Sequence, residues 1–177
     1  MGAAVSNIAN LSQVNSIVTT TTGTLWAATG NFVIILALLG VLFLFSRYVG
    51  RGPFVALLLA FYAAYALYET FPYMSYLPTA PAVTALVTHA AVYVALVLVF
   101  YMILRRVVVS DFLYIGLFGL VALSFFGAAF LVAISYHLFL ISAVYQFNPT
   151  ISAVFAPDQY FFWWFAAPAI GLFFLAR

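Results

Sequence analysis

The apolar residues of this chain come in long continuous blocks, and the length of these blocks limits what it can fold into. One block runs from Val83 to Leu104 without an Asp, Glu, Lys or Arg. A helix of about 20 apolar residues crosses the roughly 30 Å of hydrocarbon in a bilayer. There the backbone must satisfy its own hydrogen bonds, as helices or as a closed barrel. Barrel strands would be short and alternating, so the blocks predict membrane-spanning helices.

The composition excludes a water-soluble domain. Hydrophobic residues make up 68% of the chain and charged residues 5%, whereas a soluble domain has about 25% charged residues. The net charge of +2 comes from five arginines and three acids. Eight charges are too few to form a nucleic-acid surface, and we therefore expect no nucleic-acid partner. The chain has no cysteine, which excludes disulfides, thiolate metal sites and thiol nucleophiles.

The blocks predict an all-α integral membrane protein, a single bundle of five transmembrane helices. Residues 1–25 are polar and uncharged and are expected to form a tail, and residues 26–177 the membrane domain. Turns with glycine or proline separate several of the blocks, and proline ends a helix because it lacks an N–H. The predicted spans are residues 26–46, 54–71, 82–104, 112–141 and 159–176.

The fourth block is too long for one perpendicular crossing. From Phe112 to Tyr145, a helix rising about 1.5 Å per residue would reach roughly 50 Å. The helix is therefore expected to tilt, to emerge from the membrane, or to break. Gly127 is the expected weak point, because glycine costs roughly 1 kcal/mol relative to alanine inside a helix. Asp111 is expected to cap the start of this helix.

The segment after the fourth block predicts a short helix over residues 149–155, on the outer side. Asn148 followed by Pro149 is a common helix opening, since asparagine caps the first turn and proline has a helical φ. Asp158 is then expected to cap the last span.

The arginines predict the orientation in the membrane. With five spans, all of them fall on one side, and the other side has neither Lys nor Arg. Because cytoplasmic loops carry an excess of Lys and Arg, we expect the N-terminus outside and the C-terminus inside, in the cytoplasmic membrane if the chain is prokaryotic. The topology-setting residues are Arg47, Arg51, Arg105, Arg106 and Arg177.

Glu69 is the only acid well inside an apolar block. An ionisable residue within a span is costly, and it is a functional-site hypothesis by default. Helical spacing puts it on one face with Tyr62 and Tyr65. The group is expected either to relay protons or cations, or to be a structural carboxyl held by tyrosine hydroxyls.

His89 is one of two histidines, and Tyr93 shares its helix face. The second and third spans are antiparallel neighbours, so Glu69 and His89 are expected at similar depth in the outer leaflet. The pair could pass protons, since imidazole gains and loses a proton near neutral pH. The alternative, which we favour, is a hydrogen-bonded pair that fixes helix packing.

His137, the other histidine, is expected above His89 if the fourth helix is straight. This mismatch argues against a haem between the two histidines, which needs both rings at one level. A break or tilt could bring His137 down to Glu69 and His89 as a metal site. The sequence lacks short metal-ligand spacings such as HxxE or HxH, so we expect neither a metal nor a cofactor.

The sequence contains no nucleophile constellation and no phosphate-binding loop, so we do not expect an enzyme. We expect a small multi-pass membrane protein that acts as an accessory or structural subunit of a membrane or envelope assembly. Its partners would be the bilayer and another membrane subunit or a second copy. The alternative is a small transporter or channel component with an outward-facing polar site at Glu69 and His89.

Overall fold

A computed structural model describes residues 32–107, 116–139, 141, 144–145 and 147–175. The chain divides into two units, Met1–Ile34 and Ile35–Arg177, and the account below concerns the second. The predicted tail, the start of the first span, Asp111 and Arg177 lie outside the described residues.

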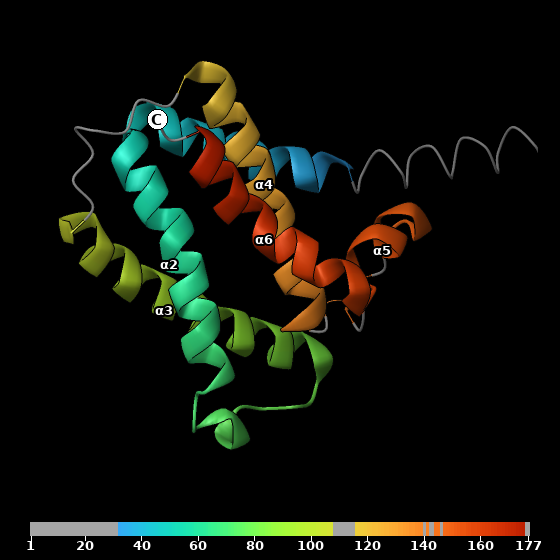
Figure 1. The fold of residues 1–177 in the computed structure, drawn as a ribbon. Helices are drawn as coiled ribbons and strands as arrows, with labels where there is room; N and C mark the ends of the chain where they lie inside the picture. Colours follow the sequence, from blue (N-terminus) through green and yellow to red (C-terminus); the bar gives the residue numbers. More distant parts are fainter. Residues whose placement is uncertain (1–31, 108–115, 140, 142–143, 146, 176–177) are drawn as a thin grey trace, which may run out of the picture. The chain divides into compact units, whose positions relative to one another are not determined.

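All regular structure in the described residues is helical (Figure 1). An apolar helix, Phe32–Tyr48, comes first. The elements that follow are α2 (Arg51–Glu69), the 3-10 turn η1 (Met74–Tyr76), α3 (Ala82–Val107), α4 (Leu117–His137), α5 (Pro149–Phe155) and α6 (Asp158–Leu175).

Three of these helices, α2, α3 and α4, are long and apolar enough to cross a membrane, which fits a membrane protein. The helix Phe32–Tyr48 is apolar but shorter within the described residues. Helix α6 has 18 residues, but its first turns carry Asp158, Gln159 and two tryptophans, which lower its mean hydropathy. The structure therefore supports three of the five predicted spans by length and composition.

Two predicted helix boundaries shift by a few residues for local reasons. Helix α2 begins at Arg51, three residues before the predicted span, because Gly50 turns the chain with φ 112°. Helix α3 continues past Leu104 to Val107 and so includes two arginines. The long arginine side chain can bury its stem while its charged group reaches water, so a helix can continue through such residues.

The fourth block is not one helix over residues 112–141. Helix α4 ends at His137, where the Leu138 N–H closes the last turn on the Ile134 carbonyl. Its 21 residues span about 31 Å at 1.5 Å per residue, which suits one crossing. Of the three alternatives, a break at Gly127 does not occur, since α4 runs through this residue. A Cβ there would lie 2.9 Å from Leu58 Cδ2 and 3.2 Å from Leu42 Cδ1, so glycine allows close packing of the helices.

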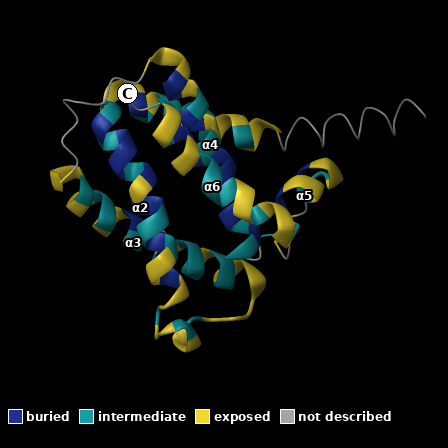
Figure 2. Ribbon diagram, viewed as in Figure 1, coloured by how far each residue is buried: buried dark blue, intermediate teal, exposed yellow. Residues whose placement is uncertain are grey.

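The helices pack as two close pairs, α2 with α3 and α4 with α6. The pairs meet through aromatic side chains: the Tyr62 ring stacks on Phe130, with ring centroids 4.8 Å apart, and meets Phe165 edge-on. Figure 2 shows buried residues concentrated on α2 and α4, whereas α3 is mostly exposed or half-buried. Helix α3 therefore has a long face that no described part of the chain covers.

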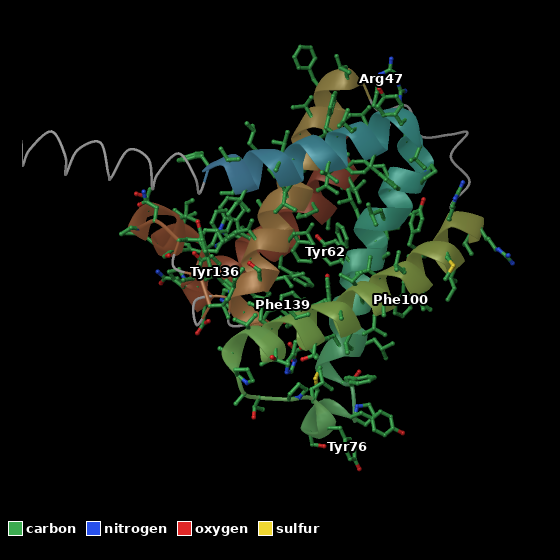
Figure 3. All side chains as sticks on the ribbon, turned by 180° about the vertical axis from the view of Figure 1, so that it is seen from behind. Arg47, Tyr62, Tyr76, Phe100, Tyr136 and Phe139 are labelled. Atoms are coloured by element: carbon green, nitrogen blue, oxygen red, sulfur yellow. The ribbon has the colours of Figure 1, made fainter. Side chains whose placement is uncertain are left out.

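The second unit has two chemically different ends. Arg47 lies in the last turn of the helix Phe32–Tyr48 and Arg51 is the first residue of α2, while Arg105 and Arg106 lie in the last turn of α3. Phe45 and Tyr101, near these turns, are in ring contact at 5.9 Å. Figure 3 shows Arg47 and Tyr76 at opposite ends. We call the end with these four arginines the arginine end, and the other, with His89 and His137, the histidine end.

Pro168 lies inside α6 and is fully buried. Proline has no N–H and its ring pushes against the preceding turn, so it opens the helical ladder. In an unbroken helix the Ala169 N–H would donate to the Phe165 carbonyl. Here the Tyr62 hydroxyl donates to the Phe165 oxygen (2.5 Å) and accepts from the Ala169 N–H (3.2 Å). Tyr62, which Figure 3 shows between the helices, thus bridges the opened turn from α2.

Tyr62→Phe should lower the free energy of unfolding by about 1–3 kcal/mol, because it leaves both backbone groups of α6 without a partner. In a Pro168→Ala background α6 can form its own backbone hydrogen bonds. Tyr62→Phe should then lower the free energy of unfolding by clearly less. Denaturant titration in mixed micelles measures both values. Tyr48→Phe, at a hydroxyl-bearing residue that is 84% exposed, is the control. An equal loss in both backgrounds would contradict the bridge.

Candidate functional site

The residues that follow α4 reach the histidine end at the level of His89. The Phe139 ring contacts Tyr68 of α2 and Tyr93 of α3, with centroids 6.1 Å and 5.6 Å away. Figure 3 shows Phe139 beside α3. The expectation that His137 sits well above His89 is therefore wrong. That estimate counted helix from Asp111, whereas α4 begins at Leu117 within the described residues.

His89 pairs with Tyr68 and not with Glu69, the next residue in the chain, which the sequence suggested. The Tyr68 hydroxyl oxygen lies 2.6 Å from His89 Nδ1. Tyr68 is buried and Glu69 is exposed, because successive helical residues point about 100° apart. No ion pair joins Glu69 to His89 in the part of the chain that the structure describes. The contact expected from the sequence is therefore replaced by a hydroxyl–imidazole hydrogen bond.

Tyr93 forms the second link between α2 and α3. It is 3% exposed, and its hydroxyl donates to the Phe61 carbonyl at 3.1 Å. A carbonyl inside a helix already accepts one bond and has a second lone pair free. Together, the Tyr68–His89 and Tyr93–Phe61 contacts fix the register of the two helices.

Glu69 is the last residue of α2, one helical turn after Tyr65, and is exposed. The Tyr65 ring packs against Phe161 and Phe165 of α6. The contact of Glu69 with tyrosine hydroxyls stays a prediction.

A cavity of about 210 Å³ opens beside His89. Besides the imidazole, Thr79 is the other polar side chain that lines it, and the remaining walls are aliphatic and aromatic. The lining residues are Thr79, Ala82, Ala85, Leu86, His89, Leu138 and Phe139. A cavity of this size and lining can hold a few waters or a small, mostly apolar molecule with one hydrogen-bonding group.

His137 links α4 to α6. Its Nδ1 donates to the Ala133 carbonyl at 2.9 Å, and its ring lies over Phe161 with centroids 4.3 Å apart. The buried Nε2 is 3.2 Å from the Asp158 carboxylate oxygen but is not aligned for a hydrogen bond. Asp158 is the first residue of α6, not the residue before it as expected. A carboxylate there is favoured by the helix dipole.

The three residues considered for a metal site do not converge. His89 is bonded to Tyr68, His137 faces Asp158, and Glu69 is exposed. Within the described residues, no group of three or more His, Asp or Glu side chains could hold a metal ion.

Helix α5 has the predicted bounds, Pro149–Phe155, and the Asn148 side chain caps it by accepting from the Thr150 N–H at 3.0 Å. Its carbonyl at Val154 accepts from the Trp164 indole at 3.1 Å. The Tyr136 hydroxyl of α4, beside α5 in Figure 3, lies 3.0 Å from the Ser152 hydroxyl. These contacts hold α5 against α4 and α6.

Tyr68, Phe139 and Pro168 are the positions that the sequence did not single out. Tyr68 had a signal, since Phe61, Ala64 and Tyr68 recur at helical spacing and are buried together. Pro168 also had one, as a proline inside an apolar block. Phe139 follows the end of α4, and no local pattern marks that end.

Comparisons of the chain with protein-family models, with curated proteins and with solved structures gave no match. Functional inference therefore rests on the residues and their geometry.

Tyr68→Phe should lower the free energy of unfolding by about 1–3 kcal/mol, because His89 Nδ1 then loses its partner. Glu69→Gln changes the adjacent, exposed position and should stay within about 0.5 kcal/mol of the parent protein. Thermal and denaturant unfolding in detergent compares the two. If Glu69→Gln proved as costly as Tyr68→Phe, the carboxylate rather than the hydroxyl would hold this end together.

Proposed function

We propose that this chain is a multi-pass membrane protein with five spans, its N-terminus outside and its C-terminus inside. Four arginines gather at one end of the second unit, and the loop through Tyr76 lies at the opposite end. This asymmetry is what the positive-inside rule requires. The helix Phe32–Tyr48 and α6 would be the first and last spans.

Cysteine labelling tests the orientation, and the chain has no native cysteine to interfere. In sealed vesicles, Ser75→Cys at the histidine end and Tyr48→Cys at the arginine end should react with a membrane-impermeant reagent from opposite sides. Arg177→Cys should react from the same side as Tyr48→Cys if α6 crosses. Labelling of all three from one side would contradict the five-span arrangement.

We propose further that the protein is a non-enzymatic accessory or structural subunit of a membrane assembly. The observation that carries this proposal is the exposed face of α3. Among the described helices, α3 has only α2 as a close neighbour. Valine and leucine at positions 83, 87, 94 and 98 are exposed and recur at helical spacing, so they form one stripe. A stripe of this kind suits a second membrane helix or lipid.

The interior polar groups support a structural role. Tyr62 bridges α6, Tyr93 holds α2, and Tyr136 holds α5. Interhelical hydrogen bonds of this kind stabilise helix packing in membranes. Each of these hydroxyls fixes one helix against another. None of the three is therefore left to bind a transported ion or molecule.

The alternative, a transporter or channel component, is favoured by the cavity beside His89. A conducting path would have to continue from there to the arginine end. The described interior in that direction contains Phe130, Leu58 and Phe54, all fully buried. The buried hydroxyl of Ser124 is bonded within its own helix, so we favour the subunit proposal.

A photoreactive residue at Leu98, on the α3 stripe, should give a discrete protein adduct in native membranes. The matched control is Phe173 on α6, which is also exposed and should give lipid adducts. Mass spectrometry separates a heterologous partner from a second copy of this chain. Lipid adducts alone at Leu98 would contradict the subunit proposal.

A further inference from the structure

The arginine end contains a second cavity, of about 340 Å³. Three helices meet there: the end of Phe32–Tyr48, the start of α2 and the start of α4. The lining residues are Ser46, Arg47, Gly50, Arg51, Leu117 and Leu120. Two arginines are therefore among the residues that line a space large enough for a phosphate ester, and no acid is among the lining residues.

The backbone adds positive potential to the same cavity. Arg51 is the first residue of α2 and Leu117 the first of α4, so two helix N-termini meet at the cavity. Each carries roughly half a positive charge from the helix dipole. The residues before them, Gly50 and Gly116, supply no side-chain cap. An anion could therefore accept hydrogen bonds from the first turns.

The sum of these charges stays positive with a carboxylate nearby. Asp111 precedes α4 in the sequence and lies outside the described residues. One carboxylate at the cavity would offset one of the two arginines. The C-terminal end of the helix Phe32–Tyr48, which also lines the cavity, adds roughly half a negative charge. The other arginine and the two helix N-termini outweigh that half charge. Arg51 makes a further interaction, but a guanidinium has five N–H donors and so can serve two partners.

We propose that this cavity binds a phosphate group, carried by an anionic phospholipid headgroup or by a free phosphate ester. The planar guanidinium fork fits phosphate oxygens in a bidentate way that lysine does not reproduce. Basic pockets between transmembrane helices on the cytoplasmic side bind such headgroups. The exposed apolar side chain of Leu117, which lines the cavity, and that of Phe118, the next residue in the chain, suit acyl chains. This inference is independent of the subunit proposal.

Native mass spectrometry of the full chain tests the phosphate site. The protein is taken from bilayers that contain phosphatidylcholine and phosphatidylglycerol in equal amounts. The parent protein should retain one phosphatidylglycerol in preference to phosphatidylcholine. Arg47→Gln should reduce that preference about fivefold, since one arginine near an anionic surface contributes a factor of this size. The control, Arg105→Gln, removes a charge from the same end but outside the cavity lining and should keep the preference.

Leu117→Glu provides a second variant that does not depend on losing an arginine. A carboxylate at the start of α4 suits the helix dipole, so the helix should form, while the added negative charge should repel phosphate from the cavity. The proposal is overturned if the parent protein shows no preference for phosphatidylglycerol over phosphatidylcholine. It is also overturned if Arg105→Gln reduces this preference as much as Arg47→Gln does.

Competition with glycerol phosphate identifies the source of the phosphate. Displacement of the retained lipid at millimolar concentration assigns the cavity to a free ester. Retention of the lipid assigns the cavity to a phospholipid headgroup. Both results support a phosphate site.

Discussion

The hydroxyl of Tyr62 holds the two helix pairs together. Pro168 opens the hydrogen-bond ladder of α6, and the Tyr62 hydroxyl enters that opening from α2, donating to Phe165 and accepting from Ala169. In hydrocarbon an unpaired backbone group costs several kcal/mol. The backbone groups of α6 beside the proline therefore need a hydrogen-bond partner. The aromatic contacts of Tyr62 with Phe130 and Phe165 depend on the same placement. One polar atom thus links a local defect in α6 to the packing of the whole helical unit.

The two ends of this unit differ in how their polar groups are arranged. At the histidine end, the imidazoles of His89 and His137 are held by a tyrosine and by a carbonyl and carboxylate. Polar groups there tie one helix to another. At the arginine end, the positive groups of Arg47 and Arg51 converge with two helix N-termini on a cavity, so like potentials accumulate. Such an arrangement favours an anion, whereas at the histidine end the Tyr68–His89 hydrogen bond joins two of the protein's own helices.

The helices themselves were largely predictable, because they depend on local patterns. The start of α5 follows from Asn148 and Pro149, and the turn after α2 follows from Pro72. The end of α4 was missed because the sequence stays apolar past His137, so composition gives no signal there. Gly127 was considered only as a weak point, because its low helix propensity is a local property, whereas its close approach to Leu58 and Leu42 depends on two other helices.

The sequence by itself determined the solvent of this protein, its helical class and the segregation of its arginines, because these depend on composition and on periods of a few residues. Only the tertiary structure decided which polar groups meet. Glu69 and Tyr68 are neighbours in the chain, yet one is exposed and the other bonds to His89. Adjacent helical residues point in directions about 100° apart, and the rotation of each helix about its axis is fixed by packing. That rotation is set by all the neighbouring helices together, and no short stretch of sequence encodes it.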